Sequence, residues 1–171
     1  MRKSVISFIM LFAIGITANA QRFALIDMEY ILKNIPAYER ANEQLNQTSQ
    51  QWQSEVEKIS EEAKTLYKNY QLGAAKLSDT QKKTKEDEIV AKEKKAAELR
   101  RQYFGPEGEL YKKRESLVKP IQDEIYNAVK EISEEKGYSV VVDRASATSI
   151  IFATPNIDIS NEVLSRLGYS N

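Results

Sequence analysis

The pattern of apolar and polar positions divides the chain into short apolar stretches near its ends and a long polar middle. Apolar runs typical of β-strands occupy residues 23–27, 138–143 and 150–154. The span 37–119 is charged, rich in helix-forming residues and too polar to bury a compact core. Three strands of about five residues are too little for a stable sheet in water. We therefore expect copies of the chain to associate through their strands and to project their helices into solvent.

The polar middle predicts a helical hairpin, and its first arm begins after a proline. A short helix at 28–34 is expected to end before Pro36, because the residue preceding a proline disfavours the helical conformation. A long helix is expected from Ala37. Between Leu45 and Tyr70 its larger side chains recur at alternating steps of three and four, which is typical of a coiled-coil seam.

The tip of the hairpin is expected near residue 78, where Gly73 and a Leu-Ser-Asp sequence interrupt the first helix. Ser78 with Gln81 three residues later matches a capping box, which predicts the start of a second helix. The two arms, 37–77 and 79–119, are then similar in length, and each would extend about 60 Å at 1.5 Å per residue. Equal lengths favour antiparallel pairing of the two helices.

The returning arm contains a break that is rich in glycine and proline. Gly105, Pro106 and Gly108 lie within four residues and defeat helix continuity. Two interpretations are open: a mobile hinge that lets the arms spread, or a rigid kink that packing holds fixed. The helix is expected to resume after the break and to become more amphipathic beyond Pro120.

The C-terminal stretch predicts most of the strand-forming body. Residues 138–143 form a β-branched strand, and a hairpin loop at 144–149 is expected to lead into a third strand at 150–154. A last short helix, capped by Asp158 or Ser160, completes the body.

These elements divide the chain into a leader (1–20), an arm (37–119) and a body (21–36 together with 120–171). The leader is typical of a secretory signal peptide, because basic residues precede an apolar stretch and a small-x-small pattern ends at Ala20. The apolar stretch is shorter than the ~20 residues of a spanning helix, so an uncleaved anchor is the weaker interpretation. We expect cleavage after Ala20. The apolar strand residues expected to join copies of the body are Phe23, Leu25, Ile26, Val140, Val141, Val142, Ile150, Ile151 and Phe152.

Composition excludes several classes of chemistry. The 171 residues include no cysteine and no histidine, so thiol chemistry, Ser-His catalysis and nearly all zinc sites are excluded. We expect no enzyme activity, no metal and no other cofactor. The 25 basic and 25 acidic residues balance, and removal of the leader leaves two more acidic than basic residues. The net charge therefore gives no case for a nucleic-acid partner.

Charge is uneven along the arm. From Lys68 to Arg101 there are ten basic and six acidic residues, whereas 37–67 and 102–136 are both net negative. These basic side chains either attract acidic partners or an anionic membrane surface weakly, or form a solvated face with i,i+4 ion pairs. The candidate residues of the basic tip are Lys82, Lys83, Lys85, Lys92, Lys94, Lys95, Arg100 and Arg101.

The sequence FALIDMEYIL at 23–32 resembles the opening strand and short helix of the Skp/OmpH family of periplasmic chaperones. YSVVVD at 138–143 resembles the second strand of that family, and residues 158–164 resemble its closing helix. No single motif is diagnostic. The order of signal, strand, long hairpin, strands and short helix carries the resemblance over essentially the whole mature chain. The insertion at Gly105 resembles the OmpH-like branch of the Bacteroidetes type.

This resemblance implies an α+β fold in which three chains close a small β-barrel-like body, from which tentacle-like coiled-coil hairpins project around a cavity. It also implies a periplasmic holdase that acts without ATP and keeps unfolded outer-membrane β-barrel proteins soluble until membrane insertion. The best-known members are strongly basic and this chain is nearly neutral, so no lipopolysaccharide site is carried over. A structural coiled-coil scaffold of the cell envelope is the alternative, which the weak heptads and the break at Gly105 disfavour.

A holdase binds many clients weakly, so it needs adaptable surface and no shaped pocket. For the seam residues Trp52, Leu66 and Tyr70, the favoured interpretation is contact between the two helices of the hairpin. Tyr67 and Leu72 lie off the seam, and client contact and a bland surface role are equally open there. The candidate client-binding residues are Trp52, Leu66, Tyr67, Tyr70, Leu72, Leu99 and Tyr103.

Overall fold

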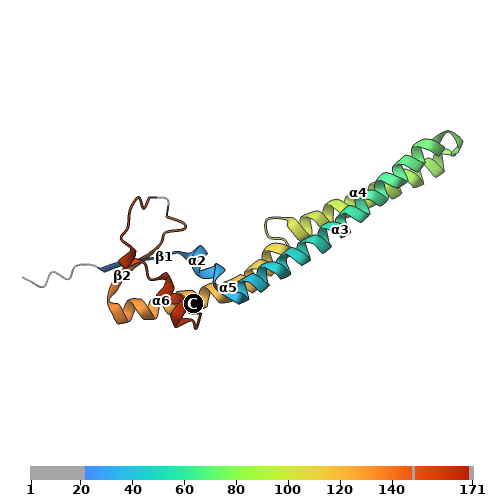
Figure 1. Ribbon diagram of the computed structural model, residues 1–171. Coiled ribbons are helices and arrows are strands. Elements are labelled where there is room, and N and C mark those ends of the chain that lie inside the picture. Colours follow the sequence, from blue (N-terminus) through green and yellow to red (C-terminus); the bar gives the residue numbers. More distant parts are fainter. Residues whose placement is uncertain (1–21, 148, 170–171) are drawn as a thin grey trace, which may run out of the picture. The chain divides into compact units, whose positions relative to one another are not determined.

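The computed structural model describes residues 22–147 and 149–169, which form two compact units (Figure 1). The first unit, the body, contains the described residues of 1–34 and 125–171. The second unit, the arm, is Ile35–Glu124. The boundary between the two units falls inside helix α5 (Glu109–Lys136). The predicted signal peptide and its cleavage site lie outside the described residues.

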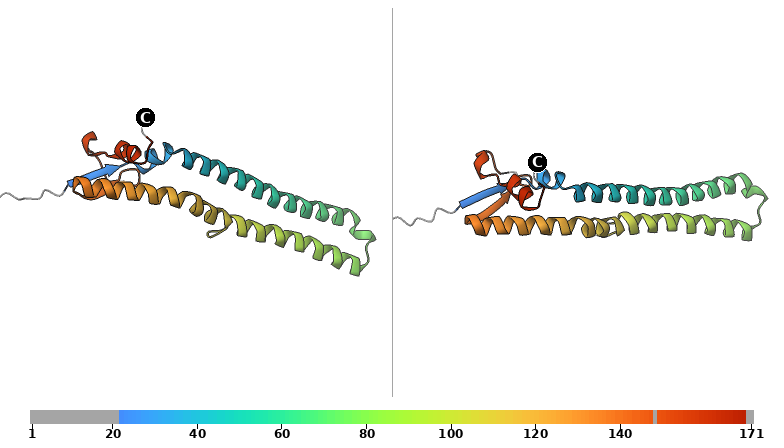
Figure 2. Two further views of the ribbon diagram at one scale, coloured as in Figure 1. Left: turned by 90° about the horizontal axis from the view of Figure 1, so that it is seen from below. Right: turned by 60° about the horizontal axis from the view of Figure 1, so that its bottom comes forward.

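The arm is built on an antiparallel pair of long helices. Helix α3 (Pro36–Gly73) and helix α4 (Asp79–Phe104) lie side by side in Figures 1 and 2. A short 3₁₀ turn, η1 (Ala74–Lys76), joins them. The Ser78 hydroxyl accepts the N–H of Gln81 (3.3 Å) and the Gln81 side chain accepts the N–H of Ser78 (2.9 Å). The predicted capping box is therefore confirmed.

Heptad spacing explains which side chains lie between the two helices. Val56 and Ala63 on α3 are seven residues apart and only 4% and 3% exposed. Ile89 and Ala96 on α4 have the same separation and are 6% and 5% exposed. Small and medium side chains at such positions let two helices approach closely, which is typical of a coiled-coil seam. The predicted seam is confirmed, although the flanking positions are polar and mostly exposed.

The third helix of the hairpin does not end at its proline. Helix α5 begins at Glu109 after the glycine-rich break and continues through Pro120 to Lys136. A proline inside a helix removes one backbone hydrogen bond. The flanking residues Val118 and Ile121 are nevertheless buried, at 9% and 8% exposure. This burial on one face offers a compensating stabilisation of the helix through the proline.

The body contains a two-stranded parallel sheet of β1 (Arg22–Ile26) and β2 (Tyr138–Asp143). Ala24 pairs with Val141 in this register. Parallel strands require a long crossover connection, and here the connection includes the whole hairpin. Helix α2 (Met28–Lys33) follows β1 directly.

The core of the body lies where helices meet the sheet. Ile31 of α2, Ile125 and Ile132 of α5, and Val163 of α6 are all fully buried, at 0% exposure. Helix α6 (Ser160–Arg166) is also attached to α5 by charge, because Arg166 pairs with Glu131 and Glu135. These ion pairs raise the pKa of Arg166 further.

The N-terminus of α6 differs from the prediction, which placed Asp158 or Ser160 at the cap. The helix begins at Ser160, and Ile159 occupies the N-cap position. The Asp158 carboxylate still accepts the N–H of Ser160 at 2.9 Å, so an acidic group satisfies a free donor at the start of the helix.

The predicted hairpin and third strand at 150–154 are wrong. Residues 150–154 have irregular backbone, and the sheet has two strands among the described residues. The Ile151 side chain is 100% exposed and that of Phe152 is 82% exposed. β-Branched and aromatic residues favour extended backbone, but a strand also needs a hydrogen-bonding neighbour. The free edge of β1 instead bonds the chain further on, because Ile159 N–H donates to the Leu25 carbonyl oxygen (2.9 Å) after a 3₁₀ turn, η2 (Pro155–Ile157).

Candidate functional site

Three of the aromatic candidates on the arm join its two long helices. The Trp52 ring on α3 stacks on the Tyr103 ring of α4, with centroids 4.7 Å apart and 6° between the planes. The Tyr103 hydroxyl donates to Glu55 (2.9 Å), and the Tyr70 hydroxyl donates to Glu86 on α4. Each carboxylate acceptor raises the pKa of its tyrosine. These contacts favour the helix-pairing interpretation of Trp52, Tyr70 and Tyr103.

Other apolar side chains of the arm face solvent. Tyr67 is 51% exposed and Leu72 is 79% exposed, which agrees with their predicted positions off the seam. Leu66 and Leu99 are half-buried between these extremes. Three further apolar groups of the arm are exposed although no pattern in the sequence marked them as candidates: Val90, Phe104 and Tyr111.

The basic tip separates into paired and unpaired cations. Lys82 and Lys85 form ion pairs with Asp79 (3.8 Å) and Glu88 (2.9 Å) one turn away. Lys92 contacts Glu62 across the two helices at 2.5 Å, and this contact lowers the pKa of Glu62. The remaining predicted cations make no ion pair with any residue that the structure describes: Lys83, Lys94, Lys95, Arg100 and Arg101.

The break between α4 and α5 is a tight turn that two glycines permit. The Gly105 N–H donates to the Arg101 carbonyl oxygen (2.9 Å), and the Gly108 N–H donates to that of Gly105 (2.9 Å). A Cβ on Gly105 would collide with the Arg101 carbonyl oxygen, and one on Gly108 would lie 2.7 Å from that of Gln102. Such close backbone approach is available only to glycine. The closed hydrogen bonds favour the rigid interpretation of the break over the hinge.

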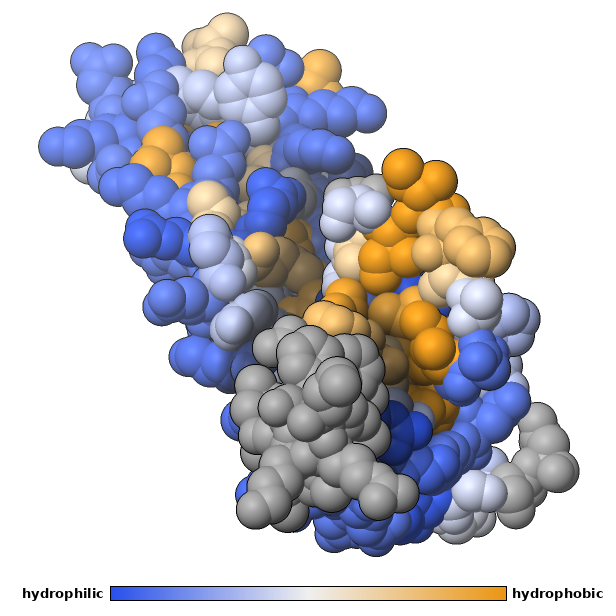
Figure 3. Space-filling model, turned by 90° about the vertical axis from the view of Figure 1, so that its left-hand side faces the viewer, coloured by the Kyte–Doolittle hydropathy of each residue, from blue (hydrophilic) through white to orange (hydrophobic). Residues whose placement is uncertain are grey.

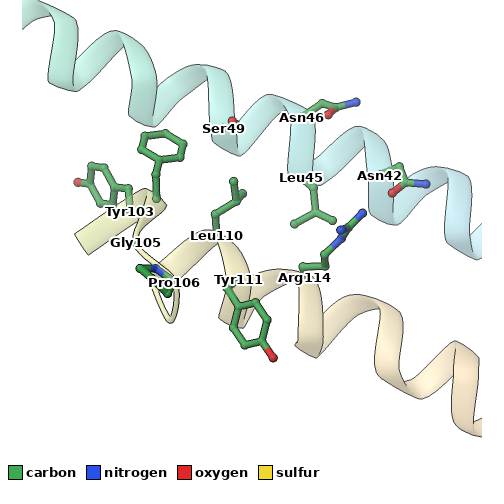
Figure 4. A pocket seen from close by; sticks show the side chains of 11 residues that line it. Asn42, Leu45, Asn46, Ser49, Tyr103, Gly105, Pro106, Leu110, Tyr111 and Arg114 are labelled. Atoms are coloured by element: carbon green, nitrogen blue, oxygen red, sulfur yellow. The ribbon is translucent and has the colours of Figure 1, made fainter. Parts of the chain in front are cut away.

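The break also opens a groove of about 410 Å³ in the arm. Figure 4 shows Leu45 on α3 and Leu110 on α5 directed into the space between these helices. Tyr103 and Pro106 lie at one end of this groove, and Arg114 lies at the other. No pattern in the sequence indicated the groove, because its lining residues come from α3, the turn and α5, which are far apart in the sequence.

Part of the predicted association surface of the body is uncovered. Leu25 and Ile26 are buried, at 7% and 6% exposure, whereas Phe23 and Val140 are 51% and 44% exposed. Figure 3 shows orange apolar side chains gathered on one side of the body. Of the remaining predicted residues, Val141, Val142 and Ile150 are half-buried, and Ile151 and Phe152 are exposed. Exposed apolar patches are typical of interaction sites in soluble proteins.

Comparison with known proteins places this architecture. The model of the outer membrane protein (OmpH-like) family matches residues 22–167. The chain belongs to the OmpH-like family. It is 23% identical over 157 residues to the chaperone protein Skp of Yersinia enterocolitica, covering 91% of both chains. It is 24% identical over 160 residues to the chaperone protein Skp of Photorhabdus laumondii, covering 91% of this chain and 90% of the other.

The fold is also that of a solved OmpH-like protein. The crystal structure of an OmpH-like protein from Caulobacter crescentus CB15 superposes with a TM-score of 0.69 at 13% identity, covering 86% of this chain and 83% of the other. The predicted resemblance and the α+β class with a long helical hairpin are confirmed. Membership of the OmpH-like family and the two Skp relatives support a chaperone role.

In this OmpH-like chain a polar network closes one end of the sheet in the body. Arg144, just after β2, pairs with Asp27 (3.1 Å) and with Asp158 (3.3 Å). Ser160 Oγ accepts the Asp27 N–H (2.8 Å) and donates to Asp158 (2.6 Å). The pKa of Asp27 is lowered, first by the hydrogen bond from the Tyr30 N–H at the start of α2 and then by Arg144. The network therefore ties three separate segments together.

Two further features bear on what this OmpH-like protein can do. None of the helices in residues 22–147 and 149–169 combines the length and the apolarity needed to cross a membrane. Over the same residues, no group of three or more histidine, cysteine, aspartate or glutamate side chains is arranged to hold a metal ion.

Proposed function

We propose that this OmpH-like protein is an ATP-independent holdase that binds unfolded outer-membrane β-barrel proteins and keeps them soluble until membrane insertion. The observation that carries the proposal is the arm itself, a charged hairpin on which Tyr67 (51% exposed), Leu72 (79%) and Tyr111 (51%) are spaced singly. Separate apolar contacts of this kind each contribute roughly 25 cal/mol per Å² of buried apolar area. Many weak contacts suit clients that share no sequence.

The body supports a homotrimer whose arms surround a cavity. Phe23 and Val140, at 51% and 44% exposure, leave apolar surface on the sheet, and β2 has one strand neighbour among the described residues. The irregular segment at 150–154 offers Ile151 and Phe152 as further apolar surface. Copies that cover these side chains would remove them from water, and three copies accord with the family resemblance.

The proposed setting is the periplasm, which the predicted signal peptide supports. The tip cations without a described ion-pair partner, such as Lys83 and Lys94, would give a weak attraction to acidic clients or an anionic membrane surface. Such an attraction falls with ionic strength, whereas apolar capture does not. The proposal includes no catalytic residue, cofactor or nucleic acid.

The test is suppression of aggregation without nucleotide. A urea-unfolded outer-membrane β-barrel protein is diluted into buffer with or without the chain starting at Gln21, and turbidity is recorded. Strong suppression at one to a few trimers per client is expected. A long coiled-coil protein at equal mass serves as the control. Binding of one fixed envelope partner with no suppression of turbidity would instead support the scaffold alternative and contradict the holdase.

A further inference from the structure

We propose that the groove at the Gly105 turn, with Leu45 and Leu110 as its walls and Arg114 at its end, is a subsite for an extended client segment. That segment presents an apolar side chain beside an acidic one. The inference rests on the proposed holdase function and adds a local preference to it. A holdase arm with one such subsite would bind apolar segments carrying an acidic residue more tightly than neutral segments of equal length.

The facing walls of the groove are apolar. Leu45 and Leu110 come from α3 and α5 and are directed into the groove from opposite sides (Figure 4). The cavity of about 410 Å³ lies within the ~300–1,000 Å³ typical of ligand pockets. The Phe104 ring, which is 36% exposed, adds apolar surface to the lining. A single large apolar side chain is the simplest occupant of such a space.

A stripe of polar residues on α3 also lines the groove. Asn42, Asn46 and Ser49 line the groove, and their side chains make no hydrogen bond with any residue of 22–147 or 149–169. Their spacing of four and three residues places them on one helix face. At 1.5 Å per residue they span about 10 Å, close to three residues of extended chain at ~3.3 Å each. Unfolded backbone carries unpaired N–H and C=O groups, which amides and hydroxyls can bond.

One end of the groove carries a positive charge. Arg114 lines the groove and forms no ion pair with a described residue. A guanidinium presents a planar set of donors that matches a carboxylate. An Asp or Glu next to the buried apolar residue of a client therefore complements this end. This combination favours a peptide over a lipid or a nucleic acid, because the groove joins one cation to a stripe of backbone-binding groups.

Two labelled peptides test the preference. The first is a short fluorescein-labelled peptide of alternating Leu and Ser with one central Asp, and the second carries Asn in place of that Asp. Fluorescence anisotropy with wild-type chain, Arg114→Gln and Arg40→Gln gives the affinities. Arg40 is an exposed arginine on α3 that is outside the groove lining, so its substitution is the matched control.

Arg114→Gln is expected to weaken the Asp peptide by about two- to fivefold, the range of one exposed ion pair. It should leave the Asn peptide unchanged, and Arg40→Gln should change neither. Equal affinity of both peptides for the wild-type chain, or equal weakening by both substitutions, would overturn the inference. If the chain suppresses client aggregation while the peptides ignore Arg114, the subsite fails and the holdase function stands.

A second measurement locates the bound peptide. A photoreactive leucine analogue in the Asp peptide is expected to cross-link to residues lining the groove, and Leu110→Ser should reduce this cross-linking. Circular dichroism establishes whether the Leu110→Ser variant remains helical. If this variant has lost helix, the cross-linking is compared between wild type and Arg114→Gln instead. Cross-links confined to other parts of the arm overturn the inference. A loss of oligomer mass in Leu110→Ser also overturns it, since a second copy would then cover the groove.

Discussion

The Trp52 ring lies flat on the Tyr103 ring, with centroids 4.7 Å apart and 6° between the planes. The two residues come from the two antiparallel helices of the arm, and Tyr103 lies two residues before the Gly105 turn. The Tyr103 hydroxyl also donates to Glu55 at 2.9 Å. This pair therefore joins α3 to α4 just before α4 ends at the Gly105 turn.

Replacing Trp52 by alanine is expected to weaken this contact between α3 and α4. Loss of the ring pair and of its half-buried surface should lower the free energy of unfolding by about 1–3 kcal/mol. Urea denaturation of the variant measures that loss, and hydrogen exchange should show faster opening of α4. Tyr67→Ala is the matched control, because its ring is 51% exposed on the same helix. A Trp52→Ala variant as stable as the Tyr67→Ala variant would contradict a stabilising role of the Trp52–Tyr103 contact.

Substituting exposed apolar groups of the arm should leave stability nearly unchanged and weaken the suppression of client aggregation. Tyr67→Ser with Leu72→Ser removes side chains that are 51% and 79% exposed, so stability should change by no more than about 0.5 kcal/mol per site. Suppression of client aggregation should weaken, so that more chain is needed for the same turbidity. Urea unfolding and the turbidity assay over a range of chain concentrations, both on the same preparation, measure the two effects. Unchanged suppression would remove these two residues from the client surface.

The two glycines of the break can be tested against a third glycine in the arm. A Cβ on Gly108 would lie 2.7 and 2.8 Å from two backbone carbonyl oxygens, whereas a Cβ on Gly73 meets nothing within 4 Å. Gly108→Ala should therefore destabilise the arm by about 1–3 kcal/mol. Gly73→Ala should be neutral or stabilising by up to about 1 kcal/mol, because alanine favours helix. Thermal unfolding of the two variants distinguishes these cases, and equal midpoints would contradict the tight turn.

The regular parts of this fold were predictable because they depend on local sequence. The heptad positions Val56 and Ala63 and the capping box at Ser78 each follow from spacings of a few residues. Strand β2 follows in the same way from its β-branched run. The segment at 150–154 has similar composition, but strand formation also depends on a neighbouring edge, and no local pattern supplies one.

The candidate site was less predictable because its contacts join distant segments. Lys92 is one of the basic residues expected at the tip, yet its Nζ lies 2.5 Å from Glu62 on the other helix. That pairing depends on the register of α3 against α4, which the sequence does not specify locally. The groove between Leu45 and Leu110 likewise depends on residues of α3 and α5 that are far apart in the sequence.

The Asp27 network predicts a loss of stability in acid. Because the folded pKa of Asp27 is lowered, its contribution is fully present above the unfolded pKa near 3.9 and is lost as pH falls through the folded value. Asp27→Asn keeps a capping oxygen but loses the charge that pairs with Arg144. The stability difference between wild type and Asp27→Asn should therefore be largest near neutral pH and should shrink below about pH 4.

Urea unfolding across that pH range measures the difference for each variant. Asp27→Ala removes the cap as well and should lose about 1 kcal/mol more than Asp27→Asn. A difference between wild type and Asp27→Asn that stays constant from neutral pH to below about pH 3 would contradict the lowered pKa.

The exposed segment at 150–154 gives the sharpest test of association. Ile151 and Phe152 are 100% and 82% exposed, so in a lone chain both would remain in water at a cost of roughly 25 cal/mol per Å² of apolar area. If neighbouring copies cover them, Ile151→Asp with Phe152→Asp places buried charges at the contact and should dissociate the oligomer. Light scattering should then report the mass of one chain in place of three. Tyr67→Asp, an equally polar change on the arm, should leave the mass unchanged.

The variant with both Ile151→Asp and Phe152→Asp should also unfold at a lower temperature than the wild type. The wild-type unfolding midpoint should rise with protein concentration, because association stabilises only the folded chain. If the variant with both Ile151→Asp and Phe152→Asp keeps the wild-type mass, a surface other than the segment at 150–154 joins the copies.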